Sequence, residues 1–195
     1  MRLRRVLQRL NHFELLGLTA RFALDGPRLE QAYRQLQTQV HPDRFAAGSD
    51  AERRLAMQWA TRANEAYRTP RDPVARARYL LHLKGFDTGE DTNTSMPPDF
   101  LMQQMEWRES VEEGRARRDA AALEALRREI EASRAEMHAL LARALGGDRN
   151  YDAGCSLVRK LRFLDRLESE IDDAVETILE GATAPRPARS AKGSA

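Results

Sequence analysis

The amino-acid sequence predicts an all-α protein built from two helical domains, and three observations lead to this fold class. Hydrophobic residues make up 42% of the 195-residue chain and aromatic residues only 6%, and its richness in alanine, leucine, arginine and glutamate favours helices over strands. Apolar residues recur at intervals of three and four along most of the chain, which is the spacing of one helix face. No segment gives a convincing strand or hairpin pattern.

A first helical domain is predicted over residues 8–84. It opens with a short apolar segment that Gly17 is expected to end. A long helix should then begin at its N-cap Asp25, with Pro27 in the first turn. Pro42 should stop this helix, because the residue before a proline avoids the helical region. The apolar residues are Phe13, Leu15 and Leu16 in the short segment and Leu29, Ala32, Tyr33, Leu36 and Val40 in the long helix.

A second long helix should begin at Ser49, because Ser49 and Glu52 have the spacing of a capping box. We expect this helix to end at Pro70. A shorter helix should run from a cap at Asp72 to Gly85. The expected buried residues of the long helix are Leu55, Trp59, Ala63, Ala66 and Tyr67, and the short helix runs through Leu80, Leu81 and Leu83.

A connector rich in glycine, aspartate and threonine is predicted over residues 85–97. Three amphipathic helices follow in residues 98–180, and their short connections predict an antiparallel three-helix bundle. Residues 181–195 have no apolar side chain larger than alanine and are predicted to be a disordered tail. The second helix of the bundle has a heptad-like seam of Leu123, Leu126, Ile130, Met137 and Leu140, and the third carries Leu157, Leu161, Leu164, Ile171, Val175 and Ile178.

The composition and charge of the chain argue against several kinds of protein. No run of about 18 apolar residues is present, so we expect no membrane span. A single cysteine, Cys155, excludes an internal disulfide and a cysteine-cluster metal site, and a reducing cytoplasm is the simplest location. The formal net charge of +2 is too small to argue for nucleic-acid binding.

His41, Pro42 and Asp43 form a tripeptide between the two long helices of the first domain. The turn could simply stop a helix, with both polar side chains solvated. It could be a general acid–base pair, which would also need a pocket and a group that orients the substrate. Alternatively, a partner protein could bind this turn. No nucleophile motif, glycine-rich phosphate loop or metal-ligand spacing accompanies it, so we predict no enzyme activity, no metal and no cofactor.

The surroundings of the tripeptide resemble a J-domain. The resembling residues are 32–45, where a helix leads into the tripeptide and a basic residue and a phenylalanine follow it, and 63–67 on the next helix. J-domains dock on DnaK-type chaperones through this tripeptide and stimulate their ATP hydrolysis. The chaperone-binding residues that the resemblance implies are His41, Pro42, Asp43, Arg34 and Arg44.

Further segments resemble the HscB family of J-domain co-chaperones. HscB proteins bring the iron–sulfur scaffold protein IscU to the specialised chaperone HscA and stimulate its ATPase, so the resemblance implies these two partners. Gln35, Gln39 and Val40 stand where generic J-domains often carry lysines and an aromatic residue, which fits a specialised chaperone. The CxxC pairs of some eukaryotic relatives are missing, so we predict no zinc. The resembling segments are residues 12–18, 79–87, 100–106 and 158–164.

The helix predicted over residues 99–113 is apolar on two opposite faces. At about 100° per residue, Phe100, Trp107 and Val111 fall on one face and suit the core. The opposite face either packs within the protein or forms a docking patch, and methionines are frequent at adaptable binding surfaces. That face carries Leu101, Met102 and Met105, beside Glu109.

The charge of the same helix favours a docking patch. Five acidic residues and one base give residues 99–113 a net charge of −4, which would steer a basic partner. By resemblance, this surface holds the scaffold protein, and Phe163 from the last helix adds to it. The expected scaffold-binding residues are Leu101, Met102, Met105, Glu106, Glu109 and Phe163.

Two rival functions stay open on the sequence alone. A helical scaffold or coiled-coil adaptor without chaperone activity would dimerise through the heptad-like seam, which a measured mass would reveal. A helical enzyme using His41 and Asp43 would turn over substrate without any partner.

Overall fold

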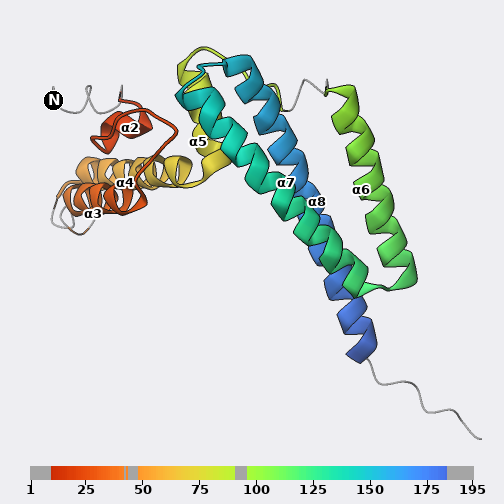
Figure 1. Ribbon diagram of the computed structural model, residues 1–195. Coiled ribbons are helices and arrows are strands. Elements are labelled where there is room, and N and C mark those ends of the chain that lie inside the picture. The colour runs from red at the N-terminus through yellow and green to blue at the C-terminus, as the bar shows by residue number, and fades with distance from the viewer. Residues whose placement is uncertain (1–9, 42, 44–47, 91–95, 184–195) are drawn as a thin grey trace, which may run out of the picture. The chain divides into compact units, whose positions relative to one another are not determined.

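The computed structural model describes residues 10–41, 43, 48–90 and 96–183 and, among these, forms seven helices and no strand (Figure 1). The all-α prediction is confirmed. The chain divides into two compact units, one of residues 1–94 and 136–162 and the other of residues 95–135 and 163–195. The helices are α2 (His12–Leu15), α3 (Gly26–Val40), α4 (Asp50–Arg71), α5 (Pro73–Leu83), α6 (Pro98–Arg117), α7 (Ala120–Gly146) and α8 (Tyr151–Thr183).

Local capping sets the beginnings of the helices in the first unit, as the sequence predicts. The Asp25 carboxylate accepts a hydrogen bond from the backbone N–H of Arg28 at 3.1 Å and caps α3. Ser49 and Glu52 form the predicted capping box of α4. Gly17 follows α2 in the left-handed conformation, with φ of 65°.

Helix α4 does not end at Pro70 as predicted, but continues to Arg71. The helix stops at Asp72, whose φ of −77° and ψ of 125° are those of extended backbone. Asp72 precedes Pro73, so the restriction that a proline places on the residue before it ends the helix here rather than at Pro70. The Asp72 carboxylate then accepts the N–H of Ala75 at 2.6 Å and caps α5.

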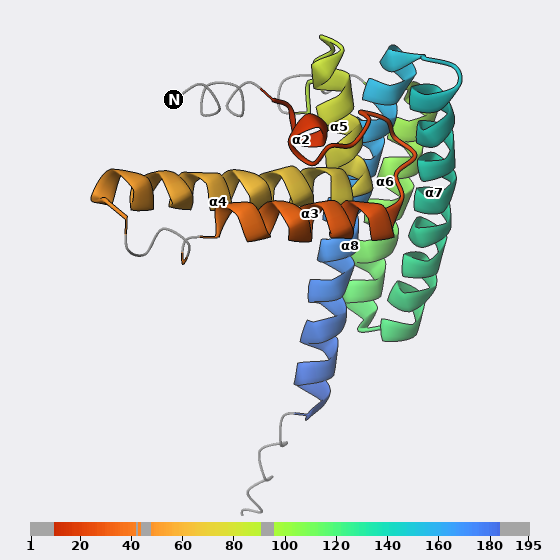
Figure 2. The ribbon, with the colours of Figure 1, turned by 90° about the vertical axis from the view of Figure 1, so that its left-hand side faces the viewer.

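Helices α3 and α4 lie side by side and antiparallel, as Figure 2 shows. Leu29 on α3 and Ala66 on α4 are buried in one cluster with residues of α2. The rings of Tyr33 and Tyr67 stack with centroids 4.2 Å apart, and the Tyr33 hydroxyl donates to Asn64 Oδ1 at 2.6 Å. This packing joins the two helices whose ends flank the tripeptide.

Helix α5 packs on the hairpin that residues 136–162 contribute to the first unit. Leu81, Leu141 and Val158 are fully buried in a single core cluster. A Cβ atom added to Gly154 would lie 3.3 Å from Leu81 Cδ2, so glycine permits this close approach. The same core shows one error in the predicted seam, since Leu140 is 40% exposed and Leu141 is the buried residue.

In the second unit, α6 packs with residues 120–135 of α7 and 163–183 of α8 as three antiparallel helices (Figure 1). Helix α6 runs to Arg117, four residues past the predicted end at Glu113. Gly114 in this last part lets the helix lie against Leu123, because an added Cβ would be 2.7 Å from Leu123 Cδ2. The seam residues of this unit are buried within its own core and are therefore not available to a coiled-coil partner. These residues are Leu123, Leu126 and Ile130.

The end of α8 also differs from the sequence prediction. Residues 181–183, predicted as the start of a disordered tail, belong to α8. The remainder of that predicted tail, residues 184–195, lies outside the described residues.

Candidate functional site

His41 and Asp43 are exposed at the end of α3. His41 caps the helix with a φ of −60° and a ψ of 130°, the extended conformation expected before a proline. Its side chain is 56% exposed and that of Asp43 is 88% exposed, with His41 Nδ1 and Asp43 Oδ2 3.5 Å apart. Both polar groups are therefore accessible to another protein.

A hydrogen bond within the tripeptide sets the chemistry of the imidazole. The backbone N–H of Asp43 donates to His41 Nδ1 at 3.3 Å. A nitrogen that accepts this bond carries no proton, so the neutral ring has its proton on Nε2 and offers a donor there. The tripeptide thus presents an N–H donor and a carboxylate acceptor.

Arg34 lies on α3, two helical turns before His41. Its side chain is exposed and forms a 3.6 Å salt bridge with Glu30 one turn earlier on the same helix. An exposed pair of this kind contributes little to stability, so Arg34 can exchange it for a partner's carboxylate. The other two expected chaperone-binding residues, Pro42 and Arg44, lie outside the described residues.

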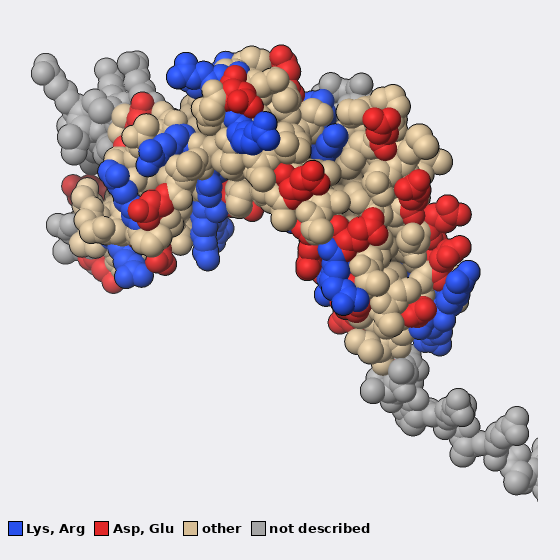
Figure 3. Space-filling model, viewed as in Figure 1, with Lys and Arg blue, Asp and Glu red and all other residues tan. Residues whose placement is uncertain are grey.

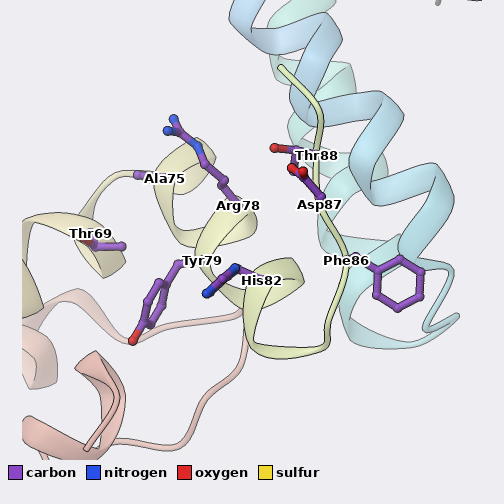
Figure 4. Close-up of a pocket in the computed structure, with 8 residues that line it drawn as sticks. All are labelled: Thr69, Ala75, Arg78, Tyr79, His82, Phe86, Asp87 and Thr88. Atoms are coloured by element: carbon purple, nitrogen blue, oxygen red, sulfur yellow. The ribbon is translucent and has the colours of Figure 1, made fainter. Parts of the chain in front are cut away.

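A cavity of about 300 Å³ in the first unit does not involve the tripeptide. Its walls come from the end of α4, from α5 and from the segment that follows α5 (Figure 4). The lining offers a single carboxylate, Asp87, and a single imidazole, His82, and Arg78 at its edge pairs with Glu90 at 3.0 Å. Within the described parts of the chain, no group of three or more histidine, cysteine, aspartate or glutamate residues could hold a metal ion.

The second face of α6 is exposed, whereas its first face is core. Phe100, Trp107 and Val111 are buried as predicted. Three apolar residues on the opposite face, which we call the docking patch, lie open instead of packing against other described residues. They are Leu101, Met102 and Met105, with exposed fractions of 42%, 63% and 72%.

Acidic side chains gather along α6 beside the docking patch, as the red surface in Figure 3 shows. Glu106 and Glu109 are both exposed. The Glu106 carboxylate accepts a hydrogen bond from the Gln103 side-chain amide at 3.4 Å. An apolar patch with a negative rim suits a partner that combines apolar and basic residues.

Phe163, the last of the expected scaffold-binding residues, is buried against α6, and its part in binding stays a prediction. Only 5% of the residue is exposed. Its ring meets Phe100 edge to face at 5.9 Å and stacks with Trp107 at 6.5 Å, because α8 and α6 pack tightly here. Phe163 therefore packs against the buried face of the helix that carries the docking patch.

The sequence analysis did not identify the contacts of two residues at this site, Arg108 and Glu129. The guanidinium of Arg108 lies over the Phe163 ring, 5.4 Å from its centroid. The Trp107 indole donates from Nε1 to Glu129 at 2.8 Å, which satisfies its one buried polar group. Arg108 could have been noticed as the one base in an acidic helix, but its contact depends on α8 and has no local sequence signal.

Comparisons with known proteins agree with this arrangement. The family model described as the HSCB C-terminal oligomerisation domain matches residues 96–172. The chain is 53% identical over 169 residues to a co-chaperone protein HscB homolog of Burkholderia mallei, covering 86% of this chain and 95% of the relative. It is 52% identical over 168 residues to the homolog of Paraburkholderia xenovorans, with the same two coverages.

Two solved structures share the fold. The chaperone HscB from Vibrio cholerae superposes with a TM-score of 0.74 at 38% identity, covering 87% of this chain and 99% of that one. The human co-chaperone protein HscB gives a TM-score of 0.78 at 28% identity, covering 84% and 81% of the two chains.

No helix in the described ranges is long and apolar enough to cross a membrane. The level of identity over most of the chain, the matching fold and the exposed side chains of His41 and Asp43 converge on one assignment. The chain belongs to the HscB family, a family of non-enzymatic co-chaperones of iron–sulfur cluster assembly whose partner is an Hsp70-type chaperone.

Proposed function

We propose that this protein binds an IscU-type iron–sulfur scaffold protein through the docking patch and delivers it to an HscA-type chaperone, whose ATPase it stimulates through the tripeptide. One observation carries the proposal. The same chain exposes the His41 and Asp43 side chains in its first unit and three apolar side chains on α6 in its second.

The tripeptide would act by recognition. His41 offers an N–H donor and Asp43 a carboxylate, while Arg34 and Arg44 add positive charge on either side of them in sequence. A partner changes the ATPase rate only if the protein binds one chaperone conformation better than another. The exposed groups would therefore favour the chaperone conformation that hydrolyses ATP.

The docking patch would hold the scaffold protein by burial of its apolar side chains. Central apolar residues usually dominate the affinity of such an interface, so Leu101, Met102 and Met105 should carry most of it. Glu106 and Glu109 should mainly raise the association rate toward a basic surface. Phe163 would contribute by supporting this helix.

The choice of an HscA-type chaperone over a general DnaK rests on α3. Gln35, Gln39 and Val40 take the places where generic J-domains often carry lysines and an aromatic residue. Fewer positive charges weaken attraction to an acidic docking site, so a dedicated partner fits better. We also propose a cytoplasmic location, the compartment in which the one free thiol, Cys155, stays reduced.

Steady-state ATP turnover by an HscA-type chaperone tests this function. We expect the protein alone to raise turnover, and the protein together with an IscU-type scaffold to raise it further. A general DnaK measured in parallel should respond less. Turnover that is the same with and without the protein would contradict the proposal.

A further inference from the structure

Arg108 is the one base between Asp99 and Glu113, and it lies within the exposed face of α6. It follows Leu101 by seven residues and Met105 by three, so the three residues share one side of the helix. Its side chain is exposed. A single positive charge therefore lies next to the docking patch, inside an otherwise acidic rim.

The position of this charge is fixed by a stack of aromatic rings. The Arg108 guanidinium lies 5.4 Å from the centroid of Phe163. Phe163 in turn meets Phe100 at an interplanar angle of 83° and stacks with Trp107 at 15°. A guanidinium that rests on an aromatic ring keeps its N–H edges available for hydrogen bonds.

Arg108 differs from the other arginines of α6 in its partners. Arg115 pairs with Glu112 at 3.4 Å, and Arg117 pairs with Glu113 at 3.6 Å. No salt bridge joins Arg108 to a carboxylate of the described residues. Its donors are thus held at the docking patch without a carboxylate partner in the described parts of the chain.

We propose that Arg108 determines the specificity of the docking patch by donating to a carboxylate on the scaffold protein, an inference that rests on the proposed function. The planar guanidinium and a carboxylate form two parallel hydrogen bonds, which fixes their mutual orientation. An acidic rim alone would accept any basic surface. Arg108 requires an acidic residue at one position among the partner's bases, and so sets the register of the complex.

The same geometry gives the buried Phe163 a role in binding. Only 5% of the residue is exposed, and its ring holds the guanidinium in place. Phe163 is therefore a positioning residue that acts through Arg108.

Reversing the charge of Arg108 distinguishes a specific pair with a carboxylate from attraction by net charge. Arg108→Glu makes the rim more acidic, so steering by net charge alone would tighten binding to a basic scaffold. Loss of a charge-assisted pair should instead weaken binding at least about tenfold. Isothermal titration of an IscU-type scaffold into the full chain measures the difference. Arg117→Ala, which removes a paired arginine on the same helix, should leave the affinity unchanged.

A double-mutant cycle tests the role of Phe163. Phe163→Leu keeps an apolar side chain in the core but removes the aromatic face. If Phe163 acts through Arg108, the variant with both Phe163→Leu and Arg108→Ala should bind about as weakly as Arg108→Ala alone. Circular dichroism and chaperone stimulation without scaffold report that each variant is folded.

The outcomes are distinct. Binding of Arg108→Glu that equals or exceeds that of the wild type overturns the proposed pair. Additive losses in the cycle overturn the positioning role of Phe163. A variant with alanine at all three docking-patch residues distinguishes a failure of the Arg108 proposal from a failure of the proposed function. If that variant binds the scaffold with wild-type affinity, the proposed function itself is refuted. If that variant loses the scaffold while Arg108→Glu binds normally, the Arg108 proposal alone fails.

Discussion

Single side chains in this protein have roles that depend on whether they are left exposed or enclosed. His41 and Asp43 contact each other, and their exposure is what a recognition element needs. His12, by contrast, stacks on Tyr79 with ring centroids 4.3 Å apart, and its Nδ1 is buried without a hydrogen-bond partner among the described residues. His41 is therefore available to a partner protein, whereas His12 packs against other residues of the first unit.

His41→Gln should abolish stimulation of the chaperone ATPase while leaving scaffold affinity and helicity unchanged. Glutamine keeps polar atoms at the turn but cannot present the same ring N–H beside Asp43. His82→Gln, at another exposed histidine of the first unit, is the matched control and should stimulate normally. A loss of helicity in His41→Gln would show that the tripeptide is structural.

His12 should make stability depend on pH. Burial lowers the pKa of His12 below 6.5, with Glu65 opposing and Arg62 reinforcing this shift. The unfolded chain therefore binds more protons, so the stability that neutral His12 contributes is present above about pH 6.5 and is lost as the pH falls toward the folded-state pKa. Urea unfolding of the wild type at a series of pH values should show this decline.

The variant His12→Phe isolates that contribution, because phenylalanine retains the stacking on Tyr79 and does not titrate. Its free energy of unfolding should fall less than that of the wild type between about pH 7 and about pH 5.5. Equal pH dependence in the two proteins would assign the decline to other groups.

At the scale of elements, a partly buried acid, Glu90, joins the segment after α5 to two helices. Glu90 pairs with Arg78 of α5 at 3.0 Å and with Arg162 of α8 at 3.6 Å, and only 10% of its side chain is exposed. Thr88 donates to Glu90 at 2.9 Å, and its carbonyl accepts from Arg159 at 2.8 Å. These contacts all lie within the first unit and hold the segment against its core.

Glu90→Gln should therefore lower the free energy of unfolding by about 1–3 kcal/mol, because it removes the largely enclosed carboxylate that Arg78, Arg162 and Thr88 all contact. Urea denaturation measures the change. Glu113→Gln removes an exposed salt bridge with Arg117 and should cost less than about 0.5 kcal/mol. Equal effects of the two substitutions would mean that Glu90 does not fasten the segment.

The elements also show how far sequence reasoning reaches. The starts of α3, α4 and α5 were predictable because Asp25, Ser49 and Asp72 act on backbone groups three residues away. The exposed face of α6 followed from helical periodicity. The burial of Leu141 instead of Leu140 was not predictable, because both positions suit a helical stripe and packing chooses between them. The burial of Phe163 could not be predicted for the same reason, since α6 decides whether its ring is covered.

At the scale of the whole molecule, the proposed sites belong to different compact units of one chain. The tripeptide lies in the first unit and the docking patch in the second. A chain that binds both partners raises the concentration of each near the other without any new contact between them. The covalent link between the sites is thus part of the proposed function.

A mixture of two variants tests whether this link is needed. One variant carries His41→Gln, and the other carries alanine at Leu101, Met102 and Met105. The first should bind scaffold without stimulating the chaperone, and the second should give basal stimulation that scaffold does not increase. If local concentration is what couples the partners, mixing the two variants should not restore scaffold-dependent ATP turnover, because no single chain then holds both proteins. Restoration to the wild-type rate would show that the two surfaces act independently.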